Sequence, residues 1–573
     1  MTSSANKHKN MSTPTSVSIS PGSLWRKGVG LLLALLWLNG LLSFTGIWPT
    51  LLVVPDTRIA PEFIVLLLLL SAVVAIAGPA PRRLLGAMAG VYLLLVVGRY
   101  ADVVVPHLLG RPVNLYWDMP QIPRFLWVTA GGLPWWVTVI ALLLVCALVW
   151  LFHRSLHLAM QVVAQAVLPV ARHTAFWCVL LPLGGLASAN YAGVQATWCC
   201  VSKPVVPAYW LETVKLWDAF FPERVARLLP ATTVIDEALA KPAEEVLVGL
   251  NHRDLMLIFL ETYGAVLYDV PEAVAATSTT RNQLEASILA SGRHVVSAFY
   301  RSPTIGGASD LAHMSVLSGI DLSDPRRHDV LLTTNRPTLL KVFQHAGYET
   351  FGLYHSVAWD WVERVYYGFD VYLSGPDLDY QGPGFGFWKV PDQFAAARVE
   401  QLYPRTKKAR PRFTLFPTIS THFPFHQVPP YQPDWKRLLS SNPFDATEAA
   451  RAQAEQVNWA NMRPDYFRTI NYTHTWFSGY FRLPEPRETI YVMIGDHQPT
   501  GSVAGEGASW DVPVFIVSRD TRLLNRFQAL GFSEGLLPDR TPLGGLHDLT
   551  ATLLRGLGAE TPEVTLALKN KTQ

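Results

Sequence analysis

Charged residues are scarce in this chain of 573 residues, of which only 16% are Asp, Glu, Lys or Arg and 50% are hydrophobic. The net charge of +3 gives no indication of a nucleic-acid surface, so we expect no nucleic-acid partner. The scarcity is uneven. Most of the charge lies after about residue 210, whereas the first 200 residues are dense in Leu, Val and Ala, a composition typical of membrane segments.

Cysteine is also scarce. The four cysteines stand at positions 146, 178, 199 and 200, and residues 201–573 contain none. A disulfide framework or a thiolate metal site is therefore excluded from the last two thirds of the chain.

The apolar part begins after a polar segment, residues 1–27, for which we expect a disordered cytoplasmic tail. Each of the apolar runs is close to the ~20 residues that cross a bilayer, so we expect five spans in a transmembrane domain at 28–195. The first run lacks a small-residue cleavage site and reads as an anchor. The runs are 29–54, 61–79, 84–105, 133–152 and 174–193.

The positive charges predict the orientation of these spans. The basic tail, Arg82 with Arg83, Arg154 and Arg172 mark cytoplasmic segments, so five spans place everything after about residue 195 outside the cytoplasm. We expect segment 153–172 to lie as a helix on the inner surface. A transporter or channel is the alternative, but the spans lack paired charges at mid-membrane and precede a much longer region.

The outer region is expected to be an amphipathic linker at 196–245 followed by a catalytic domain at 246–573. Strands alternate there with helices, which predicts an α/β fold with a mainly parallel sheet sandwiched by helices. The expected strands are 255–260, 349–354, 412–418, 489–494 and 512–517. The expected helices include 278–291, 309–318, 336–346, 445–457, 462–482 and 546–556.

Side chains that bind metals follow two of these strands. Asp496 and His497 end the run 489–494, and Glu261 follows the run 255–260. The carboxyl ends of parallel strands meet at one edge of a sheet, and carboxylates with imidazoles are ligands for divalent cations. Each motif alone is more often a solvated turn, but together they predict a metal site.

A hydroxyl and a second imidazole belong to the same predicted edge. A glycine turn at 303–310 opens a helix at Ser309; such a serine is usually an N-cap, but a nearby metal can make it a nucleophile. His422 follows the run 412–418. This set has the residue types needed for covalent phosphoryl or sulfuryl transfer.

On these motifs the outer domain resembles the alkaline phosphatase/sulfatase superfamily. With five spans, the chain resembles membrane-anchored lipoteichoic acid synthase and the related phosphoglycerol and phosphoethanolamine transferases. Ser309 precedes Gly319 by ten residues (319 − 309), as the sulfatase nucleophile precedes its glycine, and His313 takes the arginine position. Aligned on the synthase threonine, Ala308 would hold the nucleophile position. Ser309 is preferred and Thr304 is the fallback.

The resemblance implies roles for these residues. Glu261, Ser309, Asp496 and His497 would hold one divalent ion (Mn, Zn or Mg), and a second ion stays an open alternative. Ser309 would be the nucleophile, and His422 would contact the phosphate and protonate the leaving group. The implied substrate-binding residues are Trp361, Arg364, His313 and His422.

The implied enzyme transfers a phospholipid headgroup, with phosphoglycerol favoured, through a phosphoserine to an envelope glycan or lipid acceptor. It would sit in a bacterial inner (cytoplasmic) membrane as a multi-pass protein, its catalytic domain facing the periplasm or the exterior. The alternatives are a phosphoethanolamine transferase acting on a lipid A-like or glycan acceptor, an anchored sulfatase or phosphodiesterase, and a non-catalytic sensor. Leu311 and His313 replace the Pro and Arg of a formylglycine signature, which argues against a sulfatase.

Overall fold

The structure is a computed structural model that describes residues 21–48, 50–123, 134–191, 200–358, 361–386, 389–405 and 409–559. Most of the expected tail at 1–27 lies outside the described residues. The chain forms two compact units. The first unit comprises Met1–Gly46, Val53–Asp102 and Pro123–Leu211, and the second comprises Ile47–Leu52, Val103–Ile122 and Glu212–Gln573.

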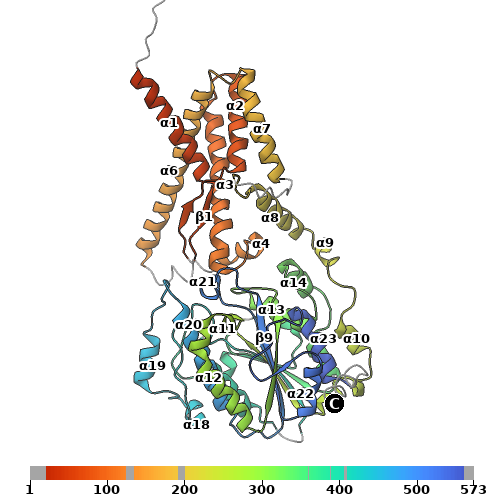
Figure 1. Cartoon of the computed structure of the whole chain (residues 1–573). Coiled ribbons are helices and arrows are strands. Elements are labelled where there is room, and N and C mark those ends of the chain that lie inside the picture. Colours follow the sequence, from red (N-terminus) through yellow and green to blue (C-terminus); the bar gives the residue numbers. More distant parts are fainter. Residues whose placement is uncertain are drawn as a thin grey trace, which may run out of the picture. The chain divides into compact units, whose positions relative to one another are not determined.

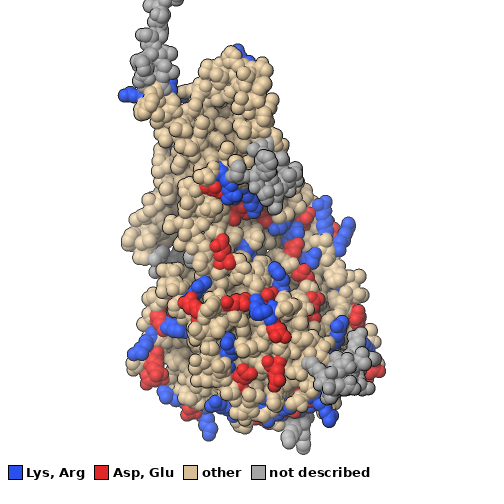
Figure 2. All heavy atoms as spheres, viewed as in Figure 1, with Lys and Arg blue, Asp and Glu red and all other residues tan. Residues whose placement is uncertain are grey.

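Helices account for the apolar runs of the first unit (Figure 1). They are α1 (Pro21–Gly40), α2 (Pro61–Ala77), α3 (Arg82–Leu109), α6 (Trp135–Val167) and α7 (Thr174–Tyr191). Of the described helices, α3 and α6 are long and apolar enough to cross a membrane; α2 and the stretch Thr174–Gly185 are apolar but shorter. Two candidate spans are therefore found, and the five-span bundle is not confirmed. Figure 2 shows few charged side chains on the visible face of these helices.

Two expectations for this region are wrong. The run 29–54 is not one helix, because α1 ends at Gly40 and the strands β1 (Phe44–Gly46) and β2 (Val53–Pro55) pair as an antiparallel hairpin. Segment 153–172 is not a separate surface helix. No Pro or Gly interrupts residues 135–167, so α6 continues unbroken through them, and Leu156 and Met160 are buried.

The second unit is built on an eight-stranded sheet in the order β10-β4-β9-β8-β3-β7-β5-β6. The five strands from β8 to β6 run parallel, whereas β9 pairs antiparallel with both β8 and β4, and β10 pairs antiparallel with β4. The expected mainly parallel sheet is thus a mixed sheet. The strands are β3 (Asp254–Leu260), β4 (His294–Arg301), β5 (Glu349–Tyr354), β6 (Val371–Ser374), β7 (Arg412–Pro417), β8 (Thr489–Gly495), β9 (Asp511–Ser518) and β10 (Ser533–Glu534).

Helices cover both faces of this sheet, as expected (Figure 1). Successive residues of β3 point to opposite faces of the sheet and pack in different hydrophobic cores. Leu257 packs in the core that contains residues of α13 (Ser309–Ser318) and α23 (Leu546–Leu557). Ile258 packs in the core that contains residues of α12 (Pro271–Ala290) and α20 (Arg463–Tyr480).

Shorter helices fill the connections. They are α4 (Leu115–Asp118), α8 (Val206–Ala219), α9 (Pro222–Ala226), α10 (Val234–Leu239), α11 (Val266–Asp269), α14 (Pro325–Leu332), α15 (Leu339–His345), α16 (Arg364–Tyr367), α17 (Asp392–Leu402), α18 (Trp435–Leu438), α19 (Ala446–Gln453), α21 (Gly501–Ala504) and α22 (Thr521–Ala529). The described residues also form three 3₁₀ turns: η1 (Ala243–Glu245), η2 (Val248–Leu250) and η3 (Pro376–Leu378).

The register of the central strands creates one functional edge. Leu260 of β3 pairs with Gly495 of β8, and Phe259 pairs with Pro417 of β7. The residues that follow these three strand ends are therefore neighbours, which places Glu261 beside Asp496 and brings the loop after β7 to the same edge.

Candidate active site

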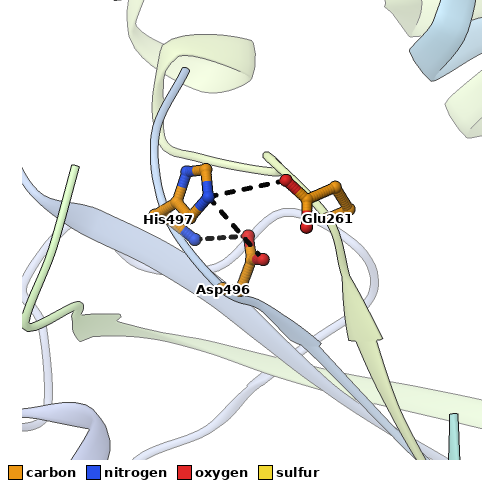
Figure 3. A group of neighbouring side chains, drawn as sticks. All are labelled: Glu261, Asp496 and His497. Atoms are coloured by element: carbon orange, nitrogen blue, oxygen red, sulfur yellow. Dashed lines mark hydrogen bonds and ion pairs between the residues drawn. The ribbon is translucent and has the colours of Figure 1, made fainter. Parts of the chain in front are cut away.

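Three buried side chains meet at this edge (Figure 3). Glu261, Asp496 and His497 each offer a ligand atom, and these atoms lie within 4.8 Å of one another. His497 Nε2 is 3.5 Å from Glu261 Oε1 and 3.8 Å from Asp496 Oδ2. The structure thus brings together the three side chains that the sequence predicted as metal ligands.

The two oxygens of the Asp496 carboxylate have different roles: one binds the backbone, and the other faces the candidate site. Oδ1 accepts hydrogen bonds from the backbone N–H of Thr262 at 2.7 Å and of His497 at 2.6 Å. Oδ2 is buried and accepts no hydrogen bond. Burial and the Glu261 charge together raise the pKa of Asp496. A buried carboxylate oxygen without a donor is costly, and a cation at this point would satisfy it.

The imidazole of His497 is held in one tautomer. Its Nδ1 lies 2.7 Å from the carbonyl oxygen of Gln498, which can only accept, so Nδ1 carries the proton and Nε2 presents a lone pair when the ring is neutral. Burial alone would lower the pKa of His497, but Asp496 and Glu261 outweigh it and raise the pKa to about 9. The ring is oriented as metal-binding histidines usually are.

The Glu261 carboxylate is oriented by the residue that follows it. Thr262 has φ +50°, and in this left-handed conformation its hydroxyl donates to Glu261 Oε1 at 2.7 Å while its N–H reaches Asp496. Burial would raise the pKa of Glu261, but the hydrogen bond and charge of His497 and the charge of His422 hold it well below the usual value. Thr262 is a site residue that the sequence analysis missed.

Ser309 places its hydroxyl inside this group. It is the first residue of α13, and the N-cap is Ala308, so Ser309 does not act as the cap. Its hydroxyl lies 3.1 Å from Glu261 Oε2 and 3.1 Å from His497 Nε2. Ala308 has φ +62°, a strained conformation for a residue with a Cβ, and this turns the chain sharply into the helix.

Thr304, the fallback nucleophile, is used differently. Its hydroxyl donates to the carbonyl oxygen of Gly307 at 2.8 Å and so stabilises the turn before Ser309. The contacts of the two hydroxyls therefore favour Ser309.

Close backbone contacts hold this turn within the second unit. A Cβ on Gly306, which has φ +71°, would lie 2.5 Å from the carbonyl oxygen of Leu109, and one on Gly501 would lie 2.9 Å from that of His107. Trp48 Nε1 donates to the carbonyl oxygen of Gly501 at 3.1 Å. Residues 47–52 and 103–122 thus belong structurally with the candidate site.

The loop after β7 carries His422 to the site. The Glu261 N–H donates to Thr418 Oγ1 at 3.1 Å, and the hydroxyl of Thr421 donates to the Glu261 carbonyl. His422 Nδ1 donates to the Phe423 carbonyl at 2.6 Å, so Nε2 is the nitrogen that exchanges a proton. A cavity of about 40 Å³ adjoins His422 and is lined by Phe385, Val390, Pro391, Ile419, Phe423 and His426 among others.

Asp392 binds the backbone of the loop that carries His422. Its carboxylate accepts from the backbone N–H of Ile419 at 2.8 Å and of Ser420 at 3.0 Å, and His355 Nε2 lies 2.8 Å from Oδ1. Asp392 and His355 are fully buried. His355 directly follows the predicted strand 349–354, a signal that the sequence analysis did not use, whereas Asp392 follows no predicted strand end.

The predicted substrate-binding residues occupy three environments. His313, one turn after Ser309 on α13, is buried with its Nε2 3.8 Å from Asp496 Oδ2. Trp361 packs against Tyr354 and Tyr367 at ring-centroid distances of 4.7 and 4.8 Å. Arg364 is exposed, with its guanidinium 5.1 Å from the ring centre of Tyr372. Headgroup contacts of Trp361 and Arg364 stay predictions.

The donor set fits a divalent cation. It offers two carboxylates, one imidazole nitrogen and a hydroxyl, and among the described residues one carboxylate oxygen, Asp496 Oδ2, accepts no hydrogen bond. Oxygen and imidazole donors in this combination suit Zn²⁺ or Mn²⁺, and the carboxylates also suit Mg²⁺.

A hydroxyl among carboxylate and imidazole groups is the arrangement that the resemblance to the alkaline phosphatase/sulfatase superfamily implied for this domain. Residues 304–558 match the family model described as Sulfatase. That match includes Ser309, His422, Asp496 and His497. The match confirms the predicted resemblance to this superfamily and the prediction of an enzyme. It does not identify the substrate. No curated protein matches the chain.

Solved structures with a similar fold share little sequence with this chain. A protein in the alkaline phosphatase superfamily from Vibrio parahaemolyticus is 18% identical, over 55% of this chain and 68% of that one, with a TM-score of 0.36. The lipoteichoic acid synthase LtaP from Listeria monocytogenes is 14% identical over 54% and 73%, with a TM-score of 0.35. The Streptococcus pyogenes phosphoglycerol transferase GacH, in complex with sn-glycerol-1-phosphate, is 12% identical over 62% and 92%, with a TM-score of 0.34.

Proposed function

We propose that this protein is a metal-dependent transferase that moves a phospholipid headgroup to an envelope glycan or lipid through a phosphoserine at Ser309. The observation that carries the proposal is the position of the Ser309 hydroxyl, 3.1 Å from both Glu261 and His497. Metal coordination activates a hydroxyl as a nucleophile, whereas the hydroxyl of an ordinary helix cap bonds to backbone N–H groups.

The first half-reaction forms the phosphoserine. Ser309 Oγ, after losing its proton to solvent, attacks the phosphorus, and the bond from phosphorus to the oxygen of diacylglycerol breaks. His422 in its protonated form donates the Nε2 proton to that oxygen, so diacylglycerol leaves as an alcohol. The headgroup phosphate remains as a diester on Ser309.

The second half-reaction transfers the headgroup. Neutral His422 takes the proton of the acceptor hydroxyl, whose oxygen attacks the phosphorus, and Ser309 leaves as an alkoxide that regains a proton from solvent. His422 thus returns to its protonated form, and the protons balance over the cycle. Acid and base roles alternate on one residue, as the ping-pong order requires.

A bound divalent cation would lower the pKa of the serine hydroxyl and offset the charge of the phosphate oxygens. Glu261, Asp496, His497 and Ser309 would hold it. Thr262 fixes Glu261, and the Gln498 carbonyl fixes the His497 tautomer. Arg364 is the predicted cationic contact to the headgroup.

A phospholipid donor is supported by the apolar helices α3 and α6, which would keep the site near a membrane, where the effective concentration of lipid is high. Phosphoglycerol is favoured over phosphoethanolamine because familiar transferases of the latter type carry cysteines in the outer domain, and residues 201–573 contain none.

An anchored sulfatase is the second candidate, favoured by the family match at 304–558. It would need a formylglycine made from Ser309. Leu311 and His313 stand where the signature for that modification has Pro and Arg, and the Ser309 hydroxyl is already placed for direct attack.

The test uses full-length protein in detergent micelles with Mn²⁺, Zn²⁺ or Mg²⁺ and either phosphatidylglycerol or phosphatidylethanolamine, each labelled in the headgroup. We expect release of diacylglycerol from phosphatidylglycerol by the wild type and release at least ~10³-fold more slowly by S309A. Release from phosphatidylethanolamine alone would select the alternative transferase. Hydrolysis of a sulfate ester without release of diacylglycerol from either lipid would overturn the proposal.

A further inference from the structure

Three glycines from distant parts of the chain meet beside the turn that precedes Ser309. They are Gly110, which follows α3, Gly306 in the turn itself, and Gly501 at the start of α21. A Cβ on Gly110 would lie 2.9 Å from Ile305 Cδ1, and one on Gly501 would lie 2.9 Å from the backbone nitrogen of Gly110. Side chains do not approach other atoms so closely, so the three backbone segments pack at a distance that only glycine permits.

The end of α3 is thereby packed against the turn that carries the nucleophile. Gly110 has φ +80°, and its N–H donates to the Pro106 carbonyl at 2.9 Å, which ends the helix. Ile305 is 1% exposed and fills the space that a side chain on Gly110 would need. α3 is one of the two described helices long and apolar enough to cross a membrane, and its residues from Val103 onward belong to the second unit.

The same turn and the candidate metal ligand His497 share one hydrogen-bond acceptor. The Gln498 carbonyl accepts from the Gly306 N–H at 3.0 Å and from His497 Nδ1 at 2.7 Å. Ile305 forms a parallel bridge with Gln498, whose side-chain amide is itself fixed by two hydrogen bonds to backbone groups. A displacement of Ile305 would therefore move the turn before Ser309 and disturb the acceptor that orients the His497 ring.

We propose that Gly110 is a positioning residue of the active site, because its missing side chain lets the end of α3 hold Ile305 and the Ser309 turn in place. The inference rests on the proposed function in that Ser309 is taken as the nucleophile. It goes beyond that function by making the end of a candidate membrane helix part of the catalytic unit, which residues 246–573 alone would not complete. A displacement of about 1 Å can lower turnover about 100-fold.

The competing explanation is that the contact only stabilises the fold. Two substitutions separate the explanations, because Gly110→Ala places a methyl group against Ile305 Cδ1 and Ile305→Val deletes that same atom. In the double variant the nearest atom of residue 305 is Cγ1, at 3.3 Å, so small shifts accommodate the new methyl group. The control is Gly78→Ala. Gly78 has φ +74°, so the backbone strain is matched, but no atom lies within 4 Å of its added Cβ.

The first readout is amide hydrogen exchange, measured by mass spectrometry on full-length, metal-free wild type, G110A, I305V, G110A/I305V and G78A in detergent micelles. The segment 303–308, which contains the Gly306 N–H, should exchange at least tenfold faster in G110A. The double variant should exchange within threefold of I305V, and G78A should match wild type. Strand β3 should exchange alike in all five proteins, whereas a loss of overall stability would speed exchange there as well.

The second readout is turnover with metal and phosphatidylglycerol. We expect kcat for diacylglycerol release to fall at least tenfold in G110A with KM changed less than threefold, because the lipid still binds but the nucleophile is displaced. The double variant should recover the kcat of I305V. G78A should stay within threefold of wild type.

The inference is overturned if segment 303–308 exchanges in G110A as in wild type, if I305V does not rescue G110A, or if G78A loses as much turnover as G110A. Should G110A not fold, Ile305→Ala removes the same contact without backbone strain at Gly110, and wild-type exchange at 303–308 in I305A overturns the inference. Exchange requires no substrate. Exchange as expected, together with no diacylglycerol release by wild type, would count against the proposed function alone.

Discussion

The Ser309 hydroxyl lies 3.1 Å from His497 Nε2, the nitrogen that presents a lone pair when the ring is neutral, because Nδ1 of the same ring donates to the Gln498 carbonyl. This relationship joins a nucleophile to a metal ligand across 188 residues of sequence. It makes Ser309 both a reacting group and part of the cation site, so changes to the residues that orient the ligands should also affect catalysis.

Thr262 tests that dependence. Its hydroxyl donates to Glu261 Oε1, so Thr262→Ala should leave the carboxylate less well oriented and lower metal affinity about 10- to 100-fold. Metal titration of EDTA-treated protein measures the effect. Thr262→Ser keeps the hydroxyl and should bind like wild type. Equal affinity in T262A and T262S would show that the hydroxyl does not orient the ligand.

The pKa of His497 predicts a pH dependence. Burial would lower this pKa, but Asp496 and Glu261 raise it to about 9, above the value of about 6.5 expected for an unfolded chain. Protonated His497 therefore stabilises the metal-free protein fully below about pH 6.5, and this stability is lost as pH rises through about 9. Metal must displace the same proton, so metal affinity should rise with pH up to about 9.

Thermal unfolding from pH 6 to pH 10 checks this expectation with EDTA and with saturating metal. The melting temperature of the metal-free protein should fall towards pH 9, and the increment due to metal should grow. In H497Q, which cannot take up the proton, both trends should flatten. Parallel curves for metal-free wild type and H497Q would contradict the assigned pKa.

Asp392 tests the support of the His422 loop. The substitution Asp392→Asn replaces one carboxylate oxygen, which accepts hydrogen bonds, by an NH₂ group, which donates them. The two oxygens of Asp392 accept from the backbone N–H groups of Ile419 and Ser420, so one of these N–H groups would lose its acceptor. D392N should therefore lower the free energy of unfolding by about 1–3 kcal/mol and reduce turnover without changing metal affinity. The control is D434N, which alters an exposed helix cap that also accepts from two backbone N–H groups. Turnover in D392N equal to that in D434N would rule out the positioning role.

The sequence predicted much of the site because strand ends can be read locally. Glu261, Asp496 and His497 each follow an apolar run, and parallel pairing of β3 with β8 brings these ends together. Thr262 could not be predicted in the same way. Its role depends on a left-handed backbone conformation and on the position of Asp496, more than 230 residues away, and neither follows from local pattern.

The fold was predicted in part for a similar reason. The run 512–517 was recognised as a strand, but its direction was not, since an apolar run reads alike in parallel and antiparallel sheets. The sequence analysis did not predict strand β4. Because β4 is the antiparallel partner of β9, the antiparallel part of the sheet could not be predicted without it. In the first unit, the hydrophobicity of residues 29–54 predicted one apolar segment. It could not predict that the helix ends at Gly40 and that the hairpin β1–β2 follows.

The most direct test of the account identifies the covalent residue. Wild type, S309A and T304V are incubated with metal and headgroup-labelled phosphatidylglycerol, quenched in acid and analysed by peptide mass spectrometry. Ser309 should carry the phosphoglycerol in wild type and T304V, and S309A should carry none and release diacylglycerol at least ~10³-fold more slowly. Label that persists in S309A, or that disappears only in T304V, would contradict the assignment of Ser309 as the nucleophile.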